Sequence, residues 1–240
     1  MRHTTVCTWN IHACIGSDGE FRPRRIAKVL EEIDADVVAL QEVEHRAVNG
    51  LDILDFLSVC TEMEAIPGPT LERGGHAYGN ALLSRLPLTD CQRHDLSWPG
   101  REPRGAIDAF FSRGDRSLRV LSTHLGLRPV ERRAQVRILL RRLESRKSDC
   151  AVLMGDLNEW LLWGRPLRWL RRHFSPTPDI GTFPSRWPLF ALDQLWVEPV
   201  HILQRLRAHR SPLARIASDH LPLVGELRFD SADSGLSSAN

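Results

Sequence analysis

The sequence has no apolar run long enough to cross a membrane. No stretch approaches the roughly 18 uninterrupted apolar residues that suit a spanning helix. Residues 1–9 also contain no apolar segment of the kind found in secretory signal peptides. We therefore expect a soluble protein.

Cysteine is scarce, and its spacing excludes two kinds of site. The chain has five cysteines, an odd number, and none forms a Cys-x-x-Cys pair. Neither a zinc knuckle nor a complete disulfide framework fits this pattern. Unpaired thiols are typical of a reducing compartment, so we expect a cytoplasmic location.

An excess of one charge is also missing. The 32 basic residues against 30 acidic ones give a net charge of +2, which excludes a globally basic nucleic-acid coat and leaves local patches to bind a polyanion. Lysine is nearly absent, because only Lys28 and Lys147 occur. The resulting arginine bias has two explanations, a GC-rich genome or selection for phosphate-binding guanidinium groups.

The composition that remains is that of an ordinary globular protein. The 240 residues are 42% hydrophobic and 26% charged, and no compositional seam divides them. We expect one monomeric domain over residues 1–230. Residues 231–240 are rich in Ser, Ala, Asp and Gly, which predicts a disordered tail.

Apolar periodicity alternates along the chain between that of strands and that of helices. Helical spacing occurs at residues 24–33, 51–60 and 131–146. Strands are expected at residues 4–9, 37–40, 80–84, 106–111, 119–123, 151–154, 193–197 and 221–229. A proline-rich stretch at 176–188 indicates a long loop. This alternation indicates an α/β fold.

Polar residues stand at the ends of nearly all these strands. They are Asn10, Glu42, His124, Asp156, Asn158, Asp193, Asp219 and His220. Because loops at strand ends converge in layered α/β proteins, we expect these side chains to lie close together. Oxygen donors with two histidines and no thiolate favour a hard cation, Mg²⁺ or Mn²⁺, over zinc.

Five short blocks between residues 8 and 222 carry a resemblance to a known family. The blocks are Thr-Trp-Asn-Ile at 8–11, Leu-Gln-Glu-Val at 40–43, Ser-Thr-His-Leu at 122–125, Gly-Asp-Leu-Asn at 155–158 and Ser-Asp-His-Leu-Pro at 218–222. In sequence and order they resemble the endonuclease/exonuclease/phosphatase family, which includes deoxyribonuclease I, exonuclease III, neutral sphingomyelinases and inositol polyphosphate 5-phosphatases. The resemblance implies a four-layered α/β sandwich, with two mostly antiparallel β-sheets packed face to face and helices outside.

The resemblance also implies roles for the metal and water residues. Glu42 resembles the principal ligand of Mg²⁺, with Asn10 and Asp219 completing or supporting the inner shell. Asp156 resembles the residue that orients or deprotonates the attacking water. Asn158 is placed two positions further on, where its amide would donate to a phosphoryl oxygen.

The remaining site residues resemble the phosphate-binding part of the family's site. Asp193 and His220 match a carboxylate and histidine pair, and His124 matches the second histidine, which hydrogen-bonds the phosphate or protonates the leaving group. Arg104 lies in a block that contacts phosphate in some members, with Arg101 as a rival. Together these roles imply in-line attack of water on a phosphoester. Taken singly, each residue has a structural alternative as a strand cap, a core histidine or a solvated arginine.

Residues 160–172 are the most individual segment of the chain, with three tryptophans among four arginines. Three interpretations are open: a peripheral membrane contact, a platform for nucleic acid, or a helix that simply packs on the domain. We expect a phosphodiesterase acting on nucleic acid, with hydrolysis of phospholipid headgroups or inositol-type phosphates at a membrane surface as the alternative. A binding scaffold without catalysis is a third hypothesis, disfavoured because every motif position is retained.

Overall fold

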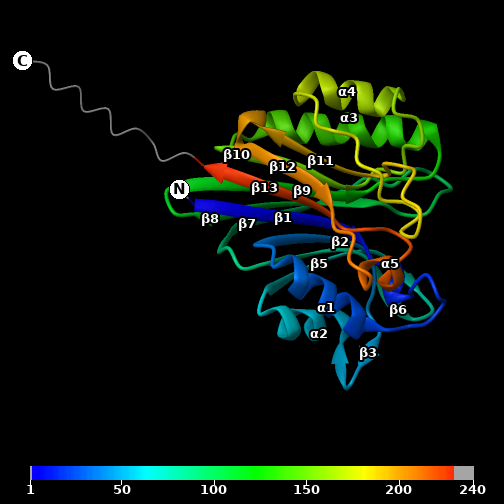
Figure 1. Cartoon of the computed structure of the whole chain (residues 1–240). Helices are drawn as coiled ribbons and strands as arrows, with labels where there is room; N and C mark the ends of the chain where they lie inside the picture. Colours follow the sequence, from blue (N-terminus) through cyan, green and yellow to red (C-terminus); the bar gives the residue numbers. More distant parts are fainter. Residues whose placement is uncertain (1, 230–240) are drawn as a thin grey trace, which may run out of the picture.

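The computed structural model describes residues 2–229 and arranges them in two stacked β-sheets (Figure 1). The tail expected at residues 231–240 lies outside the described residues. The six-stranded sheet has the order β12-β13-β1-β2-β6-β5, with β1 at Arg2–Asn10, β2 at Val37–Glu44, β5 at Glu64–Arg73, β6 at His76–Ser84, β12 at Leu203–Ala208 and β13 at Leu223–Phe229. The five-stranded sheet has the order β11-β10-β9-β8-β7, with β7 at Leu88–Asp95, β8 at Gly105–Arg113, β9 at Arg116–His124, β10 at Cys150–Asp156 and β11 at Asp193–Glu198. Strands β3 (Ala47–Val48) and β4 (Leu51–Asp52) form a small hairpin.

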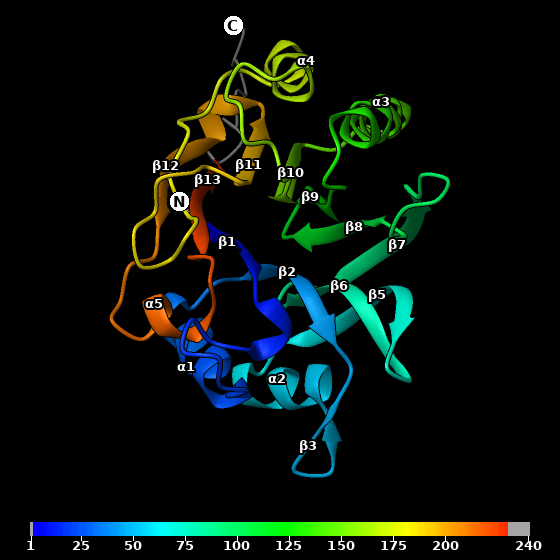
Figure 2. The same cartoon turned by 90° about the vertical axis from the view of Figure 1, so that its right-hand side faces the viewer.

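Helices cover the outer face of each sheet. In Figure 2, α1 and α2 lie beneath the six-stranded sheet, and α3 and α4 lie above the five-stranded one. The helices are α1 at Pro23–Ile33, α2 at Ile53–Thr61, α3 at Pro129–Ser145, α4 at Arg165–His173 and α5 at Ala214–Ala217, with short 3-10 helices η1 at His12–Cys14 and η2 at Val200–Ile202. These layers confirm the expected four-layered α/β sandwich. None of the described helices has the length and apolar character needed to span a membrane.

Alternation along the strands separates the core into three apolar layers. On β1, Val6 belongs to the cluster between the two sheets, whereas the next residue, Cys7, belongs to the cluster beneath α1 and α2. The third cluster packs Leu139 of α3 and Leu170 of α4 against the five-stranded sheet. Both faces of each sheet are therefore buried, so the ends of the strands and their loops are the places left for a functional site.

Strand direction brings the polar strand ends to one end of the sandwich, hereafter the site end. Strands β1 and β2 run parallel to each other, as do β9 and β10. Strand β11 runs antiparallel to β10, with Asp193 opposite Asp156, and β13 runs antiparallel to β1. The last residues of four strands and the first residues of two others consequently share the site end, which faces the viewer in Figure 2.

In the two large sheets, the structure contains three strands that periodicity did not predict, and all three are sheet edges. The hairpin strands β3 and β4 were also not predicted. Strand β5 contains Pro67 and Pro69, which have no N–H to donate, and β7 and β12 consist mostly of polar and charged side chains. Such composition is tolerated at an edge, where one side of the strand is unpaired. It lacks the continuous apolar run by which the central strands were predicted.

One buried ion pair fastens α3 to the five-stranded sheet. The Arg119 guanidinium on β9 is 1% exposed and pairs with both oxygens of Asp108 on β8, with Nε–Oδ1 2.8 Å and Nη2–Oδ2 2.7 Å. The same group donates to carbonyl oxygens near the end of α3, those of Arg142, Leu143 and Arg146. Because these carbonyls have no helical partner, Arg119 satisfies the helix end and the carboxylate together.

We predict that Arg119→Met lowers the free energy of unfolding by about 3–5 kcal/mol, because Asp108 remains buried without its counter-charge. Urea denaturation measures this difference. The double variant Arg119→Met, Asp108→Leu should recover much of the loss, and the exposed control Arg141→Met should stay within about 0.5 kcal/mol of the wild type. A single variant as stable as the control would contradict the assigned role.

Candidate active site

The centre of the site is Asp156, whose carboxylate is 1% exposed at the end of β10. Its position depends on the preceding residue, because a Cβ on Gly155 would lie 1.8 Å from the Thr123 carbonyl oxygen. The Asp156 Oδ2 atom lies 3.6 Å from His124 Nε2 and 3.7 Å from His220 Nε2. A carboxylate is thus held between two imidazoles that come from different parts of the chain.

Asn10, at the end of β1, ties this carboxylate to a second one. Its Nδ2 donates to Glu42 Oε1 at 3.0 Å and to Asp156 Oδ2 at 3.1 Å, while its Oδ1 accepts the His12 N–H at 3.0 Å. Glu42 lies at a β-bulge, where the pairing of β2 with β6 shifts register, and has a left-handed backbone with φ of 57°. Bulges re-aim side chains, and this one places the Glu42 carboxylate beside Asn10.

His220 is held as a charged imidazolium. Its Nδ1 lies 2.8 Å from Asp193 Oδ2, and the Thr182 hydroxyl donates to the same oxygen at 2.5 Å. Burial by itself would lower the pKa of His220, but the Asp193 and Asp156 carboxylates outweigh it and raise the pKa to about 10. The ring also packs against Phe183, with centroids 4.8 Å apart.

His124 is held in the opposite charge state. Burial lowers the pKa of His124 to about 3; Asp156 opposes this effect and the nearby Arg104 charge adds to it. The Arg104 Nη1 atom lies 3.2 Å from His124 Nδ1, and Asn158 Nδ2 lies 2.9 Å from His124 Nε2. Donors therefore face both ring nitrogens, and the positive charge of Arg104 opposes protonation of the ring.

The structure thus brings together six of the predicted residues, each in contact with another member of the group: Asn10, Glu42, Asp156, Asn158, His124 and His220. Asp193 lies behind His220, and Arg104 lies behind His124. Arg104 is 9% exposed and also pairs with Glu102. The rival Arg101 does not join this group; its Nε lies 3.1 Å from Glu131 Oε1.

Asp219 occupies the outer, more exposed side of the site. Its Oδ1 accepts from the Ser218 hydroxyl at 3.3 Å and lies 3.8 Å from His12 Nδ1. The Ser218 hydroxyl also approaches the Asn10 carbonyl at 2.7 Å. The loop before β13 is thereby joined to the end of β1, which brings Asp219 toward the carboxylates described above.

The donor set fits a hard cation better at Glu42 than at the histidines. Oxygens of Asp156 and Asp193 and a nitrogen of His220 lie within 4.8 Å of one another, a spacing that would suit a metal. However, an imidazolium that faces carboxylates on both nitrogens has no lone pair to offer. The carboxylates of Glu42 and Asp219 remain as oxygen ligands of the kind that Mg²⁺ and Mn²⁺ prefer. Asn10, whose nitrogen faces Glu42, supports this set by orienting it.

Three residues of the site were missed by the sequence analysis. Thr182 contacts Asp193, Phe183 contacts His220, and Tyr78 lies beside Glu42, where burial and that carboxylate raise the pKa of the Tyr78 hydroxyl. His12, set aside from its sequence context, contacts Asn10 through its backbone. The sequence offered only weak signals for these residues. Thr182 and Phe183 precede Asp193 in the long loop, and Tyr78 is the only tyrosine of the sequence.

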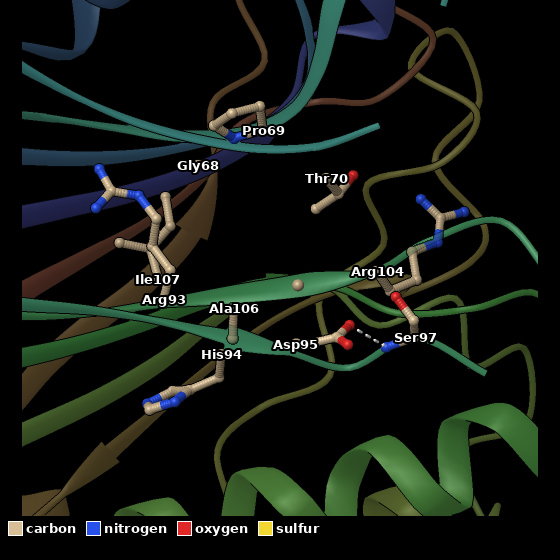
Figure 3. A pocket seen from close by; sticks show the side chains of 11 residues that line it. Gly68, Pro69, Thr70, Arg93, His94, Asp95, Ser97, Arg104, Ala106 and Ile107 are labelled. Atoms are coloured by element: carbon tan, nitrogen blue, oxygen red, sulfur yellow. Dashed lines mark hydrogen bonds between the residues drawn. The ribbon is translucent and has the colours of Figure 1, made fainter. Parts of the chain in front are cut away.

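A cavity of about 300 Å³ opens on the Arg104 side of the site, between the two sheets (Figure 3). Gly68, Pro69 and Thr70 line it from the six-stranded sheet. Asp95 and Ser97 line it from the other side; in Figure 3 they are joined by a hydrogen bond of 2.8 Å. Arg104 borders both this cavity and His124, so the cavity is continuous with the site.

Comparison with known proteins agrees with this fold. The sequence profile of the Endonuclease/Exonuclease/phosphatase family matches residues 7–220. The uncharacterized protein YbhP of Escherichia coli is 28% identical over 252 aligned positions, covering 93% of this chain and 96% of YbhP.

Solved structures share the architecture at lower sequence identity. An endonuclease/exonuclease/phosphatase from Beutenbergia cavernae superposes with a TM-score of 0.77 at 24% identity, covering 97% of this chain and 73% of that one. A mannosyl-6-phosphatase from Bacteroides thetaiotaomicron superposes with a TM-score of 0.71 at 17% identity, covering 94% of this chain and 100% of that one. Because the family profile spans most of the chain, the protein belongs to the endonuclease/exonuclease/phosphatase family of phosphoester hydrolases.

Proposed function

We propose that the protein is a divalent-metal-dependent phosphodiesterase in which water attacks phosphorus in line with the departing alcohol. The observation that carries this proposal is the position of the buried Asp156 carboxylate between the His124 and His220 rings, with its Oδ2 atom 3.6 Å and 3.7 Å from their Nε2 atoms. The water oxygen bonds to phosphorus, one ester P–O bond breaks, and the water proton passes to the leaving alcohol. The products are a phosphomonoester and an alcohol.

Asp156 is the group that orients and deprotonates the water. Its Oδ1 accepts the backbone N–H of Asn158 at 2.9 Å, and its Oδ2 accepts the Asn10 amide. Two fixed hydrogen bonds leave the remaining lone pairs in set directions, which is what a positioned general base needs. Its burial also keeps bulk water from competing with the single water that reacts.

Positive charge and donors surround the position of the phosphoryl group. The His220 imidazolium and the Arg104 guanidinium are the cations, and Asn158, whose amide faces His124 and the Leu125 carbonyl oxygen, lies beside them. Their charge and N–H groups stabilise the oxygens on which negative charge grows in the transition state. Neutral His124 contacts Arg104 and Asn158 through its two ring nitrogens and holds these side chains in place.

Glu42 and Asp219 are the carboxylates that would hold the cation, with Asn10 orienting Glu42. When bound, Mg²⁺ or Mn²⁺ supplies a positive charge that polarises the phosphoryl group and stabilises the leaving alkoxide. The side chains nearby are dominated by four carboxylates, those of Glu42, Asp156, Asp193 and Asp219. The His220 imidazolium, the Arg104 guanidinium and a divalent cation would together balance these four negative charges.

The arginines in and just after the second half of α3 lie away from the site. Arg142 and Arg146 lie near the C-terminal end of this helix, where Arg119 binds their carbonyl oxygens. Arg119 belongs to the first half of β9, away from His124 at its last residue. Arg137 instead stacks over the Trp169 ring, 4.7 Å from its centroid. These three arginines therefore lie on the outer layer, whereas Arg128, just before α3, lines a groove together with Arg101 and Arg104.

We predict that Asp156→Asn lowers kcat by about a thousandfold, because the amide cannot accept the water proton. Hydrolysis of bis(p-nitrophenyl) phosphate with added Mg²⁺ or Mn²⁺ measures the effect. Asp115→Asn is the matched control, since Asp115 is exposed in the turn between β8 and β9. If the Asp156 variant keeps activity near that of the control, the general-base role is wrong.

We predict that chelation abolishes activity and that Mg²⁺ or Mn²⁺ restores it. The cation should also raise the Tm of the chelator-treated protein, because a ligand that binds only the folded chain stabilises it. Glu42→Gln should remove most of this Tm shift, whereas Asp115→Asn should retain it. Full activity in the presence of chelator, or an unchanged Tm shift in Glu42→Gln, would contradict the metal assignment.

We predict opposite charge states for the two histidines in metal-free protein. With a pKa raised to about 10, His220 should stay protonated through neutral pH. Its ion pair should contribute fully to the free energy of unfolding at pH values below the pKa of histidine in the unfolded chain. This contribution should decline as the pH rises toward 10. With a pKa lowered to about 3, His124 should be neutral over the same range. NMR titration of ring ¹³C shifts, assigned with His124→Gln and His220→Gln, measures both, and Asp193→Asn should lower the pKa of His220. A neutral His220 at pH 7 would refute the assignment.

A further inference from the structure

A patch of large apolar side chains is exposed beside the active site. It consists of residues 160–163 in the loop after β10 and Trp187, Leu189 and Phe190 in the loop before β11. Trp163, Trp187 and Leu189 are 70%, 76% and 78% exposed. Tryptophan is usually well buried, and contiguous exposed apolar side chains on a folded domain mark an interaction surface.

The two loops of this apolar patch are joined to each other and to the catalytic centre. The Trp160 ring contacts those of Phe183 and Phe190, at centroid distances of 5.8 and 4.9 Å. Phe183 in turn packs on the His220 ring. A continuous row of rings therefore runs from the imidazolium to the exposed side chains, so whatever binds the patch is close to the reacting phosphorus.

Arginines without acidic partners border the patch. Arg165, Arg168 and Arg172 are exposed on α4, the helix that follows Trp163, and make no ion pair within the described residues. The carboxylates nearby are already neutralised, Glu159 by Arg132 at 3.2 Å and Asp179 by Arg171 at 2.9 Å. The border of the patch is accordingly positive, and it complements an anionic surface.

The neighbouring helix accounts for only part of the aromatic segment. On α4, Leu167 and Leu170 are fully buried and Trp169 packs against the same apolar cluster. Trp160 to Trp163 precede this helix and remain exposed. The packing interpretation thus covers residues 165–173, while the loop before them is left for a partner.

We infer that the apolar patch docks the protein on an anionic phospholipid bilayer and that the diester it hydrolyses is the headgroup phosphodiester of a lipid. Trp163, Trp187 and Leu189 enter the boundary between headgroups and acyl chains, and the α4 arginines contact lipid phosphates. This inference rests on the proposed phosphodiesterase function and names its substrate. Water adds to the lipid phosphorus and one ester bond breaks, leaving a phosphomonoester and an alcohol.

The composition of the patch distinguishes a bilayer from a nucleic acid. Bases stack on aromatic rings, and the tryptophans alone would serve that purpose. Leu161, Leu162 and Leu189 offer neither a ring nor a hydrogen bond, yet they are 48%, 40% and 78% exposed. Aliphatic side chains interleaved with tryptophan, with arginine at the border, are the combination that an interfacial lipid contact uses.

The test is co-sedimentation with vesicles of phosphatidylglycerol and phosphatidylcholine, compared with vesicles of phosphatidylcholine alone. We expect binding to the anionic vesicles that weakens as salt is raised. The double variant Trp163→Ser, Trp187→Ser should bind about tenfold less or weaker still, and so should a variant with Arg165, Arg168 and Arg172 changed to Gln. Val59→Ser is the matched control, because Val59 is 69% exposed on α2, in the opposite outer layer.

Co-sedimentation measures membrane binding independently of catalysis, so Asp156→Asn should still bind vesicles. This result would hold even if the phosphodiesterase proposal were wrong. The ratio of headgroup release from vesicles to hydrolysis of bis(p-nitrophenyl) phosphate should fall in the tryptophan variant, with Tm unchanged.

Three results would overturn the inference. One is absence of binding to anionic vesicles at low salt. Another is equal binding by the tryptophan variant and Val59→Ser. The third is a different occupant of the patch. This occupant would be a second copy of the chain if the wild type is a dimer that the tryptophan variant converts to monomer, or single-stranded DNA if the protein binds it through Trp163 and Trp187 and does not bind vesicles.

Discussion

The site depends on one amide that holds two carboxylates from different sheets. Asn10 ends β1 and Glu42 lies at the bulge of β2, both in the six-stranded sheet. Asp156 ends β10 of the five-stranded sheet, and Asn10 Nδ2 donates to both carboxylates. Without that donor, two negative groups would face each other in a largely buried place, at considerable electrostatic cost. This pair of hydrogen bonds therefore links the two sheets at the site end and holds the two carboxylates at a fixed spacing.

Burial alone would make both histidines neutral, and their different neighbours separate them. Asp193 and Asp156 supply two negative charges to His220, whereas Arg104 supplies a positive charge to His124. Two residues of the same type on either side of one carboxylate thus perform different tasks. Such a pair, with pKa values moved apart by the surroundings, is the arrangement that acid and base chemistry at one pH requires.

The parts of the molecule that were predictable from sequence are those with strong local signals. Central strands show continuous apolar runs that end in polar residues. The family motifs at these strand ends identified Asp156, His124 and His220 from the sequence alone. The edge strands β5, β7 and β12 lacked that signal, because an edge buries less and tolerates proline and charge. Thr182 and Tyr78 were missed because their contacts form only in the folded chain. Hydroxyls that support a carboxylate have no fixed spacing from it in sequence.

The composition of strand β5 affects the tendency of the protein to aggregate at high concentration. Pro67 and Pro69 remove two N–H donors from an edge of the six-stranded sheet, and Gly68 between them has Ile107 atoms 2.5 Å from where a Cβ would lie. A strand from another molecule therefore finds an incomplete ladder of donors at this edge. The same prolines that hid β5 from periodicity protect the sheet from extending into aggregates.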